Sequence, residues 1–389
     1  MPKKTKVEPE ASKSEAEPSN KMSVADSSLL ARKLAAQAKL IKKMGATGCV
    51  GTALKPPDFY PTGLPVFDRE VLGIGGLPKG RIIEIYGPKS SGKSALSFKL
   101  AGAVQAQDLT AIVKIYDVEH SCTSAWLQSM GLDLSRTIVI GSPDETISEE
   151  SRPLSAEEIG TMIQADISMG ELAPSIIILD SIAVLQPEGV METEFEDRNM
   201  RDNLARADFL TKFFDSLTGG FYYPGANKDG KLPDDAKKYS IGGTTTCLLC
   251  INHAKERTKK VGPKTFVEWY SVGGVALDFH AVIQLMVTRR GFEKGLDGNV
   301  SHQKVHVCAD KNKVAPPKRE CDLLLSFKGG MEQLGTIDWL SLAISKGLAT
   351  KDGAWIKSTV LLPNDKIQGE EKFNQFIDGN EEAKKLLTD

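Results

Sequence analysis

A loop of glycines, serines and lysines at residues 87–94 has the composition and spacing of a phosphate cradle. It reads GPKSSGKS and fits the pattern G-x-x-x-x-G-K-[ST] in full, between an apolar run and a helical stretch. Glycines let backbone N–H groups turn toward phosphate oxygens, and the N-terminus of the next helix adds a positive dipole. We therefore predict a nucleoside triphosphate site formed by Gly87, Pro88, Lys89, Ser90, Ser91, Gly92, Lys93, Ser94 and Ala95.

A carboxylate at the end of a second apolar run would complete this site with a metal. Asp180 follows the run Ser175–Leu179, which predicts a buried strand. In phosphate-loop enzymes such a carboxylate holds Mg²⁺ and orients the hydroxyl of the loop, here that of Ser94. An aspartate at a strand end is often only a cap, but the loop at 87–94 favours the metal function.

A third polar group follows the apolar run Ala111–Tyr116. Hydrolysis of ATP needs a group that orients and deprotonates the attacking water. Glu119 is the candidate for this base. The alternative is a carboxylate that caps the chain after the strand.

The elements that must hold these residues alternate along the chain. Short β-branched runs and longer helical stretches follow one another from about residue 55 to residue 335. This order predicts an α/β fold with a mostly parallel sheet covered on both faces, and ligands bind at the carboxyl ends of such strands. The predicted strands are Arg81–Tyr86, Ala111–Tyr116, Thr137–Ile140, Ser175–Leu179, Thr245–Ile251, Ala281–Val287 and Lys304–Val307.

Composition limits the classes of function. The chain has 389 residues, 41% hydrophobic content and a net charge of −2, so any nucleic-acid surface must be local. Its six irregularly spaced cysteines favour a reducing compartment, and we expect Cys247 and Cys250 to be buried thiols rather than metal ligands. No run approaches the roughly 18 apolar residues of a membrane helix, and we recognise no signal or transit peptide. These features predict a cytoplasmic protein, or one of the host cytoplasm if its source is viral.

Changes in composition divide the chain into four regions. We expect a disordered tail at residues 1–27, an N-terminal oligomerisation helix and linker at 28–54, a core at 55–335 and a small C-terminal domain at 336–389. The apolar stripe of the helix could pack on its own domain or on a neighbouring subunit. The C-terminal domain should hold two amphipathic helices, at 337–349 and 371–387, around a short strand at Trp355. Residues 219–240 read as an inserted loop without an assigned role.

A run of positive charge followed by aromatic residues lies between His253 and the paired glycines. Basic side chains can follow a phosphate backbone while apolar side chains stack on bases. A solvated surface is the alternative. The residues concerned are Lys255, Arg257, Lys259, Lys260, Lys264, Phe266, Trp269 and Tyr270.

Taken in order, these motifs resemble the RecA family of homologous-recombination ATPases, which includes the bacterial RecA recombinases and phage recombinases of the UvsX type. The resemblance covers roughly residues 60–360 and implies a RecA-like P-loop NTPase core. Phosphate-loop motifs are shared by many ATPases, whereas the later motifs are more specific to recombinases. The matching segments are 87–94, 117–120, 177–181, 251–253, 273–274 and 311–313.

The resemblance implies roles for residues around the nucleotide. Glu119 matches the catalytic glutamate of the family, and Trp126 matches an aromatic residue that stacks on adenine. Thr123 stands where bacterial members carry an acidic adenine contact, which leaves base selectivity open. His253 stands where they carry glutamine, facing the γ-phosphate, and a neutral imidazole can still donate a hydrogen bond there. The alternative for His253 is a histidine of the core.

Two lysines match residues that reach a neighbouring subunit. Lys311 and Lys313 resemble lysines that contact the neighbour's ATP, where they would neutralise charge as an arginine finger does. Catalysis would then require self-association. The alternative is a pair of exposed strand lysines.

The resemblance also implies two DNA-binding loops. The basic and aromatic run after His253 matches the second loop, and the pair Gly273 and Gly274 would let the backbone approach phosphate closely. The first loop should lie at residues 194–201. Its candidate contacts are Arg198, Met200, Arg201 and Arg206.

Together these observations predict a DNA recombinase that uses ATP and Mg²⁺. It would form a helical filament on single-stranded DNA, pair it with homologous double-stranded DNA and exchange strands during recombination and repair. Further partners that the resemblance implies are a single-strand-binding protein and mediator proteins. We expect no association with a membrane. The alternatives are a ring-forming helicase with the same core and a non-catalytic, ATP-bound DNA-binding mediator. An arginine finger and a dedicated N-terminal domain would favour the helicase.

Overall fold

The computed structural model describes residues 24–44, 57–141, 152–193, 200–219, 241–261, 264–273, 275–295, 298–334 and 339–388. Contacts divide the chain into two compact units, Met1–Pro56 and Pro57–Asp389. The described part of the first unit is helix α1 (Val24–Lys43), which begins four residues before the predicted helix. The leucines of its predicted apolar stripe, at 29, 30, 34 and 40, are exposed. The tail before residue 24 and the insertion at 220–240 lie outside the described residues.

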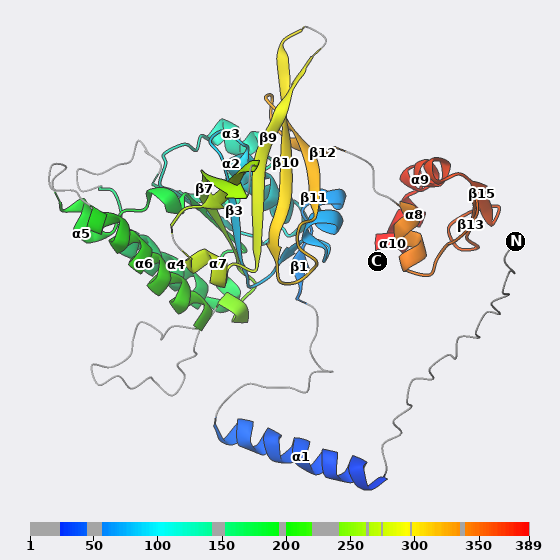
Figure 1. Cartoon of the computed structure of the whole chain (residues 1–389), viewed down its shortest axis with the longest axis horizontal. Coiled ribbons are helices and arrows are strands. Elements are labelled where there is room, and N and C mark those ends of the chain that lie inside the picture. The colour runs from blue at the N-terminus through cyan, green and yellow to red at the C-terminus, as the bar shows by residue number, and fades with distance from the viewer. Residues whose placement is uncertain are drawn as a thin grey trace, which may run out of the picture. The chain divides into compact units, whose positions relative to one another are not determined.

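The second unit is built on a large mixed sheet (Figure 1). From one edge to the other its order is β12-β11-β10-β9-β3-β7-β6-β4-β5, and β8 pairs with β7 outside this path. The central strands are β3 (Ile82–Gly87), β4 (Val113–Asp117), β5 (Thr137–Ile140), β6 (Ile176–Asp180), β7 (Cys247–Val261) and β9 (Ile283–Lys294). The remaining strands are β8 (Lys264–Ser271), β10 (Val300–Asn312), β11 (Glu320–Ser326) and β12 (Met331–Leu334).

The predicted α/β class and mostly parallel sheet are confirmed, with an antiparallel addition. All neighbours from β9 through β3 to β5 pair in parallel, whereas β9, β10, β11 and β12 pair antiparallel. The seven predicted strands are present, but β7, β9 and β10 run well past their predicted ends. Figure 1 shows β9 and β10 continuing together beyond the rest of the sheet. Apolar runs mark only the buried part of such strands, because the projecting part has no core to face.

Alternation along the strands separates two apolar layers. On one face, Ile83 and Ile85 belong to the same cluster as α2 (Lys93–Gln107) and α3 (Ser124–Ser129). On the other face, Ile82 belongs to a cluster with α4 (Ala156–Ser168), α6 (Met200–Gly219) and α7 (Ala276–His280). Each fully buried isoleucine contributes about 1.5–3 kcal/mol by leaving water. These layers fix the strands whose ends carry the predicted site.

Small elements complete the core. Strands β1 (Phe59–Tyr60) and β2 (Leu77–Pro78) form a separate antiparallel pair. The helix α5 (Glu188–Met191) is a single turn that precedes α6. Cys247 and Cys250 are fully buried on β7, as predicted. Within the described residues, no cluster of three or more metal-binding side chains is found, and no helix has the length and apolar character needed to cross a membrane.

The C-terminal region has more elements than we predicted. Helix α8 (Trp339–Ser345) precedes a three-stranded antiparallel sheet of β13 (Thr350–Asp352), β14 (Trp355–Lys357) and β15 (Lys366–Gln368). The prediction of one helix over 371–387 was wrong, because α9 (Glu370–Asp378) and α10 (Glu381–Thr388) are separate. Asn380 starts α10: its side-chain oxygen accepts a hydrogen bond from the Ala383 N–H at 3.1 Å.

Candidate functional site

A cleft of about 680 Å³ lies at the carboxyl ends of the central strands. Its volume falls in the range of roughly 300–1,000 Å³ that is usual for small-molecule sites. The residues predicted to bind phosphate, metal and attacking water meet in it. Its lining is Lys89, Ser90, Ser91, Gly92, Lys93, Ser94, Ala95, Glu119, Trp126, Asp180, Ile251, His253, Ala254, Gln303, Leu325 and Phe327.

The loop between β3 and α2 has the backbone that its glycines allow. Gly92 has a φ of 102° and Ser90 a φ of 57°, so the chain turns through left-handed conformations before α2 begins. At Gly87 there is no space for a side chain, because an added Cβ would lie 2.0 Å from the Val287 carbonyl oxygen. These positions explain why the loop needs glycine at its first and sixth residues.

The polar atoms of the loop fit a bound phosphate chain. Lys93 Nζ donates to the carbonyl oxygens of Gly87 at 3.1 Å and Pro88 at 2.8 Å, and the residue is buried. Burial lowers the pKa of Lys93, while the charges of Asp180 and Glu119 oppose this shift. Ser91 Oγ is buried without a hydrogen-bond partner among the described residues. A phosphate oxygen would satisfy Ser91 and offer Lys93 an anionic acceptor.

A hydroxyl and a carboxylate form the donor set for a metal. Ser94 Oγ donates to Asp180 Oδ2 at 2.6 Å, and the side chain of Asp180 is buried. Burial raises the pKa of Asp180 to about 6, opposed by the hydrogen bond from Ser94 and increased by the nearby charges of Glu119 and Asp117. Oxygen ligands beside a phosphate site suit Mg²⁺, and a bound cation would favour the ionised carboxylate.

Glu119 faces this cleft next to Asp180. The backbone N–H groups of Val118 and Glu119 both donate to the Asp180 carbonyl oxygen, at 2.7 and 3.3 Å. Glu119 Oε1 accepts a hydrogen bond from Ser181 Oγ and lies 3.0 Å from His253 Nε2. Because Glu119 is an acceptor when ionised, His253 must carry its proton on Nε2 in this contact. The carboxylate is therefore held at the cleft with one oxygen engaged.

The capping function that was the alternative for Glu119 belongs to another residue. Asp117 accepts hydrogen bonds from the backbone N–H groups of Ser121 at 3.0 Å and Cys122 at 2.8 Å. Its side chain is buried under this turn. Glu119 is thus spared for the cleft, although its catalytic role stays a prediction.

The two residues at the positions that contact adenine in the family, Trp126 and Thr123, have different surroundings. Trp126 lines the cleft, whereas Thr123 caps α3, its hydroxyl oxygen accepting from the Trp126 N–H at 3.3 Å. Three further residues line the cleft that we did not predict. Gln303 lies on β10, and Leu325 and Phe327 lie at the end of β11. Gln303 Nε2 donates to the Ser90 carbonyl oxygen at 3.2 Å. These residues carry no motif, and only the antiparallel strands bring them to the phosphate loop.

Lys311 and Lys313 lie at the end of β10 and do not line the cleft of their own chain. Lys311 Nζ donates to the Asp278 carbonyl oxygen, and Lys313 Nζ donates to that of Phe279 at 2.8 Å. Burial, and then the charge of Lys313, lower the pKa of Lys311. The lysines are thus gathered at the end of α7, and their contact with a neighbour's ATP stays a prediction.

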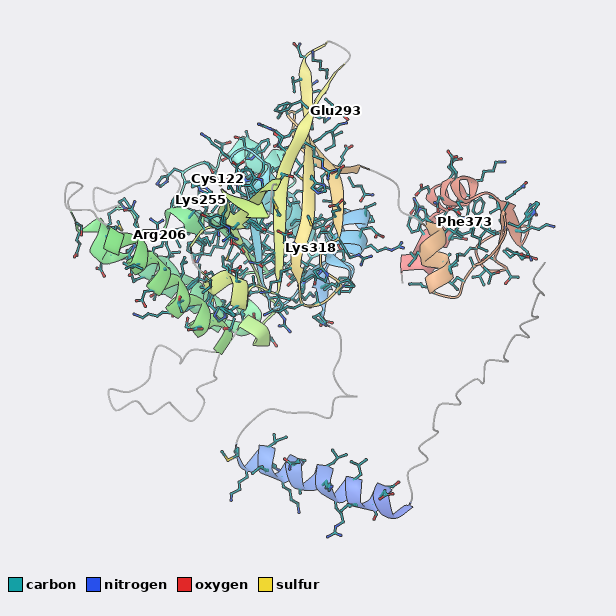
Figure 2. The ribbon with its side chains drawn as sticks, in the orientation of Figure 1. Cys122, Arg206, Lys255, Glu293, Lys318 and Phe373 are labelled. Atoms are coloured by element: carbon teal, nitrogen blue, oxygen red, sulfur yellow. The ribbon has the colours of Figure 1, made fainter. Side chains whose placement is uncertain are left out.

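The basic and aromatic run forms a two-stranded ribbon rather than a loop. Strand β7 leaves the sheet and pairs with β8, from Ala254 opposite Ser271 to Val261 opposite Lys264. Figure 2 shows Lys255 on β7, and the Arg257 guanidinium lies 5.6 Å from the centre of the Tyr270 ring. The side chains of Lys259, Lys260, Lys264 and Phe266 lie outside the described residues, and Trp269 is half-buried.

The paired glycines and the first loop are described in part. Gly273 has a φ of 97° and follows the ribbon, while Gly274 and Arg198 lie outside the described residues. Met200 and Arg201 begin α6, but their side chains are not described.

Arg206 lies on α6 (Figure 2) and forms hydrogen bonds that the sequence did not predict. It donates to the carbonyl oxygens of Leu185 and Ala183, both at 2.7 Å. Burial lowers the pKa of its guanidinium. These bonds tie α6 to the turn after β6, so the group is not directed at a phosphate in this structure.

Comparison with known proteins agrees with this architecture. Residues 49–220 match the family model of the RecA N-terminal domain. A protein named RecA from Geobacter metallireducens is 30% identical over 327 residues, which cover 84% of this chain and 82% of the relative. The chain belongs to the RecA family. Proteins named RecA from Cytophaga hutchinsonii, 29% identical over 87% of this chain and 88% of the relative, and Geobacter sulfurreducens, 30% identical over 82% and 80%, support the same membership.

Proposed function

We propose that this RecA-family chain is a DNA recombinase with DNA-stimulated ATPase activity. With ATP and Mg²⁺ it would assemble as a helical filament on single-stranded DNA, pair that strand with homologous duplex DNA and exchange strands. The observation that carries the proposal is strand β7. It presents His253 to Glu119 at the cleft and then continues directly into the basic β7–β8 ribbon.

The cleft supports hydrolysis of ATP by the residues that line it. Bound ATP and Mg²⁺ would supply the phosphoanhydride bond and a charge that neutralises phosphate oxygens. Lys93 and the loop N–H groups would hold the phosphates, and Ser94 with Asp180 would hold the metal. Glu119 would orient the attacking water and take its proton, which its open oxygen permits. The Nε2–H group of His253 would turn from Glu119 to a phosphate oxygen when ATP binds, and Trp126 would stack on the adenine base.

The ribbon supports DNA binding without sequence preference. Lys255 and Arg257 extend from β7 on an exposed surface, and Tyr270 on β8 is also exposed. Such groups bind phosphates and stack on bases of a single strand. Base pairing between strands would then supply the sequence recognition.

Assembly is proposed from two further features. The exposed leucine stripe of α1 would bind a neighbouring subunit, because an isolated helix of this kind gains stability by packing its apolar face. Lys311 and Lys313 would reach the neighbour's cleft from the end of α7. In this proposal residues 28–54 serve oligomerisation, 55–335 form the ATPase core and 336–389 form a C-terminal domain.

One pair of measurements tests the proposal. ATP hydrolysis is measured with and without single-stranded DNA, and the same mixtures are viewed by electron microscopy. We expect hydrolysis to rise with DNA and filaments to appear with ATP and Mg²⁺. Hydrolysis independent of DNA together with closed six-membered rings would instead identify a helicase-like motor. Absence of hydrolysis, with DNA binding retained, would identify a non-catalytic mediator.

A further inference from the structure

A buried carboxylate that the proposed chemistry does not use lies beneath the cleft. Glu84 is in the middle of β3 and is completely buried. None of the ion pairs among the described residues includes it. Burial raises its pKa, and hydrogen bonds from Asn252, Gln284 and Ser271 oppose this shift. A carboxylate kept at such a place by hydrogen bonds alone calls for an explanation.

Two amide side chains from the flanking strands hold Glu84. Asn252 Nδ2 donates to Oε1 at 2.7 Å from β7, and Gln284 Nε2 donates to Oε2 at 2.6 Å from β9. Gln284 is the direct register partner of Glu84. Both carboxylate oxygens accept hydrogen bonds in this arrangement, so both amides turn their NH₂ groups inward.

The side-chain amide of Asn252 forms hydrogen bonds toward both the ribbon and the cleft. Its Nδ2 also donates to the Val272 carbonyl oxygen at 2.7 Å, directly after β8. Its Oδ1 accepts from the His253 N–H at 2.8 Å, and the His253 ring contacts Glu119. One amide therefore links the end of the ribbon to the backbone of the residue that faces the proposed base.

The side-chain amide of Gln284 forms a hydrogen bond to the segment that holds Lys311 and Lys313. Its Nε2 also donates to Asp278 Oδ1 at 2.9 Å. The backbone carbonyl of Asp278 holds Lys311, and that of Phe279 holds Lys313. Glu84 thus lies where connections to the ribbon, to His253 and to the lysine-bearing segment meet.

We propose that Glu84 is a positioning residue that couples DNA on the β7–β8 ribbon to the ATP site. It does so by fixing two amides, that of Asn252 between Val272 and His253 and that of Gln284 beside the segment that holds Lys311. The proposal rests on the proposed function, since it concerns the stimulation of hydrolysis by DNA. A displacement of the ribbon at Val272 pulls on an amide that cannot rotate, so it moves the backbone of His253. Without the carboxylate the amide can turn, and the displacement is absorbed.

A glutamine at position 84 would test this by presenting a donor where only acceptors fit. Its NH₂ group would meet that of Asn252 or of Gln284, and one of them would have to turn over. If Asn252 turns, its NH₂ group meets the His253 N–H. If Gln284 turns, its carbonyl oxygen meets Asp278 Oδ1. Glu84→Gln therefore breaks either the connection through Asn252 or the one through Gln284, while keeping the size of the side chain.

The experiment compares turnover with and without single-stranded DNA in the full-length chain. For Glu84→Gln we expect the ratio of the two rates to fall by roughly tenfold, within the 5–150-fold range of coupled sites, and DNA affinity to change by less than about threefold. Turnover without DNA should fall far less than turnover with DNA. Asp68→Asn is the matched control, because Asp68 is also a buried carboxylate but is bonded to Thr62, outside the site. It should keep the wild-type ratio.

A triple variant examines the direction of the hydrogen bonds. In Glu84→Gln/Gln284→Glu/Asp278→Asn, the side chain at position 84 accepts from Asn252 and donates to the carboxylate at position 284. That carboxylate also accepts from the amide at position 278, so the hydrogen bonds around both flanking positions are satisfied again. We expect it to recover most of the DNA stimulation. If Glu84→Gln does not fold, as judged by thermal unfolding, Asn252→Ala replaces it and should lose the stimulation as well.

Several results would overturn the proposal. It fails if Glu84→Gln, or Asn252→Ala in its place, is stimulated like the wild type. It also fails if Asp68→Asn loses stimulation equally, if rates with and without DNA fall in the same proportion, or if a folded triple variant recovers nothing. A wild-type protein that DNA does not stimulate would refute the proposed function itself. A stimulated wild type with an equally stimulated Glu84→Gln would refute only the role of Glu84.

Discussion

Replacing Glu119 by glutamine should separate the chemical step from binding. Glutamine has the same size, and its carbonyl oxygen can still accept hydrogen bonds from Ser181 and His253. In the native protein, His253 Nε2 lies 3.0 Å from Glu119 Oε1. The Glu119 side chain is 32% exposed, so solvent screens its contact with His253. The loss of charge should therefore cost the folded state less than about 1 kcal/mol.

Turnover should respond far more strongly than stability. An amide cannot accept a proton from water at neutral pH, and loss of a general base lowers kcat by about 10²–10⁴-fold. ATP binding should not weaken, because the substitution removes a negative charge next to a site for phosphates. The Kd for ATP should stay equal or decrease by up to about fivefold, which corresponds to roughly 1 kcal/mol.

The assay is release of inorganic phosphate in the presence of single-stranded DNA, with ATP and DNA binding measured by titration. Glu293→Gln is the matched control, because Glu293 lies on the projecting part of β9 and pairs with Lys304, away from the cleft (Figure 2). Turnover of Glu119→Gln within about tenfold of wild type would remove Glu119 from the role of base. Loss of ATP binding in parallel with turnover would show instead that Glu119 holds the site together.

Three further predictions use other parts of the structure. Gly87→Ala should lower the free energy of unfolding by about 1–3 kcal/mol, because its Cβ would collide with the Val287 carbonyl oxygen, and an unchanged denaturant midpoint would contradict the close approach. Asp68 has a pKa raised from 3.8 to about 6 by burial, so its stabilising contribution is present below pH 3.8 and is lost as the pH rises through 6. The difference in unfolding free energy between wild type and Asp68→Asn should therefore fall by about 2.4 kcal/mol between pH 4 and 7, and a flat difference would refute this. Lys255→Ala should reduce the slope of log affinity for single-stranded DNA against log salt by about 0.7, the value for one phosphate contact, in anisotropy titrations; an unchanged slope would place Lys255 off the DNA path.

The sequence predicted those parts of the site that depend on neighbours along the chain. Residues 87–94 form a loop in which glycines occupy the crowded position at Gly87 and the left-handed position at Gly92. Asp180 ends a strand with a continuous apolar run. The capping role of Asp117 could not be predicted in the same way. Asp117 ends β4 and Glu119 comes two residues later, and only the hydrogen bonds from Ser121 and Cys122 show which of the two carboxylates caps the turn.

The parts that could not be predicted depend on strands far apart in the sequence. Gln303 and Phe327 reach the cleft because the last strands of the sheet are antiparallel. The predicted strands 281–287 and 304–307 leave residues 288–303 between them, a length that also allows a helical crossover, because the projecting parts of β9 and β10 carry no apolar run. Arg206 looks like any surface cation until its two carbonyl partners are known. The break between α9 and α10 is a local exception: Gly379 ends α9 and Asn380 caps α10, within a pattern whose apolar periodicity runs on through both helices.

Whether Lys311 and Lys313 act on a neighbour can be tested by mixing two inactive proteins. Glu119→Gln would have a dead cleft and intact lysines, and Lys311→Ala/Lys313→Ala would have an intact cleft and no lysines. Each alone should be inactive on DNA. In a random one-to-one filament, an interface is productive only when a sound cleft meets sound lysines, so activity should reach about a quarter of wild type through this head-to-tail contact. If the lysines served their own cleft, no mixture would gain activity, because every subunit would still lack one component. A mixture without activity, in which electron microscopy shows mixed filaments, would therefore refute the action of Lys311 and Lys313 on a neighbour's cleft.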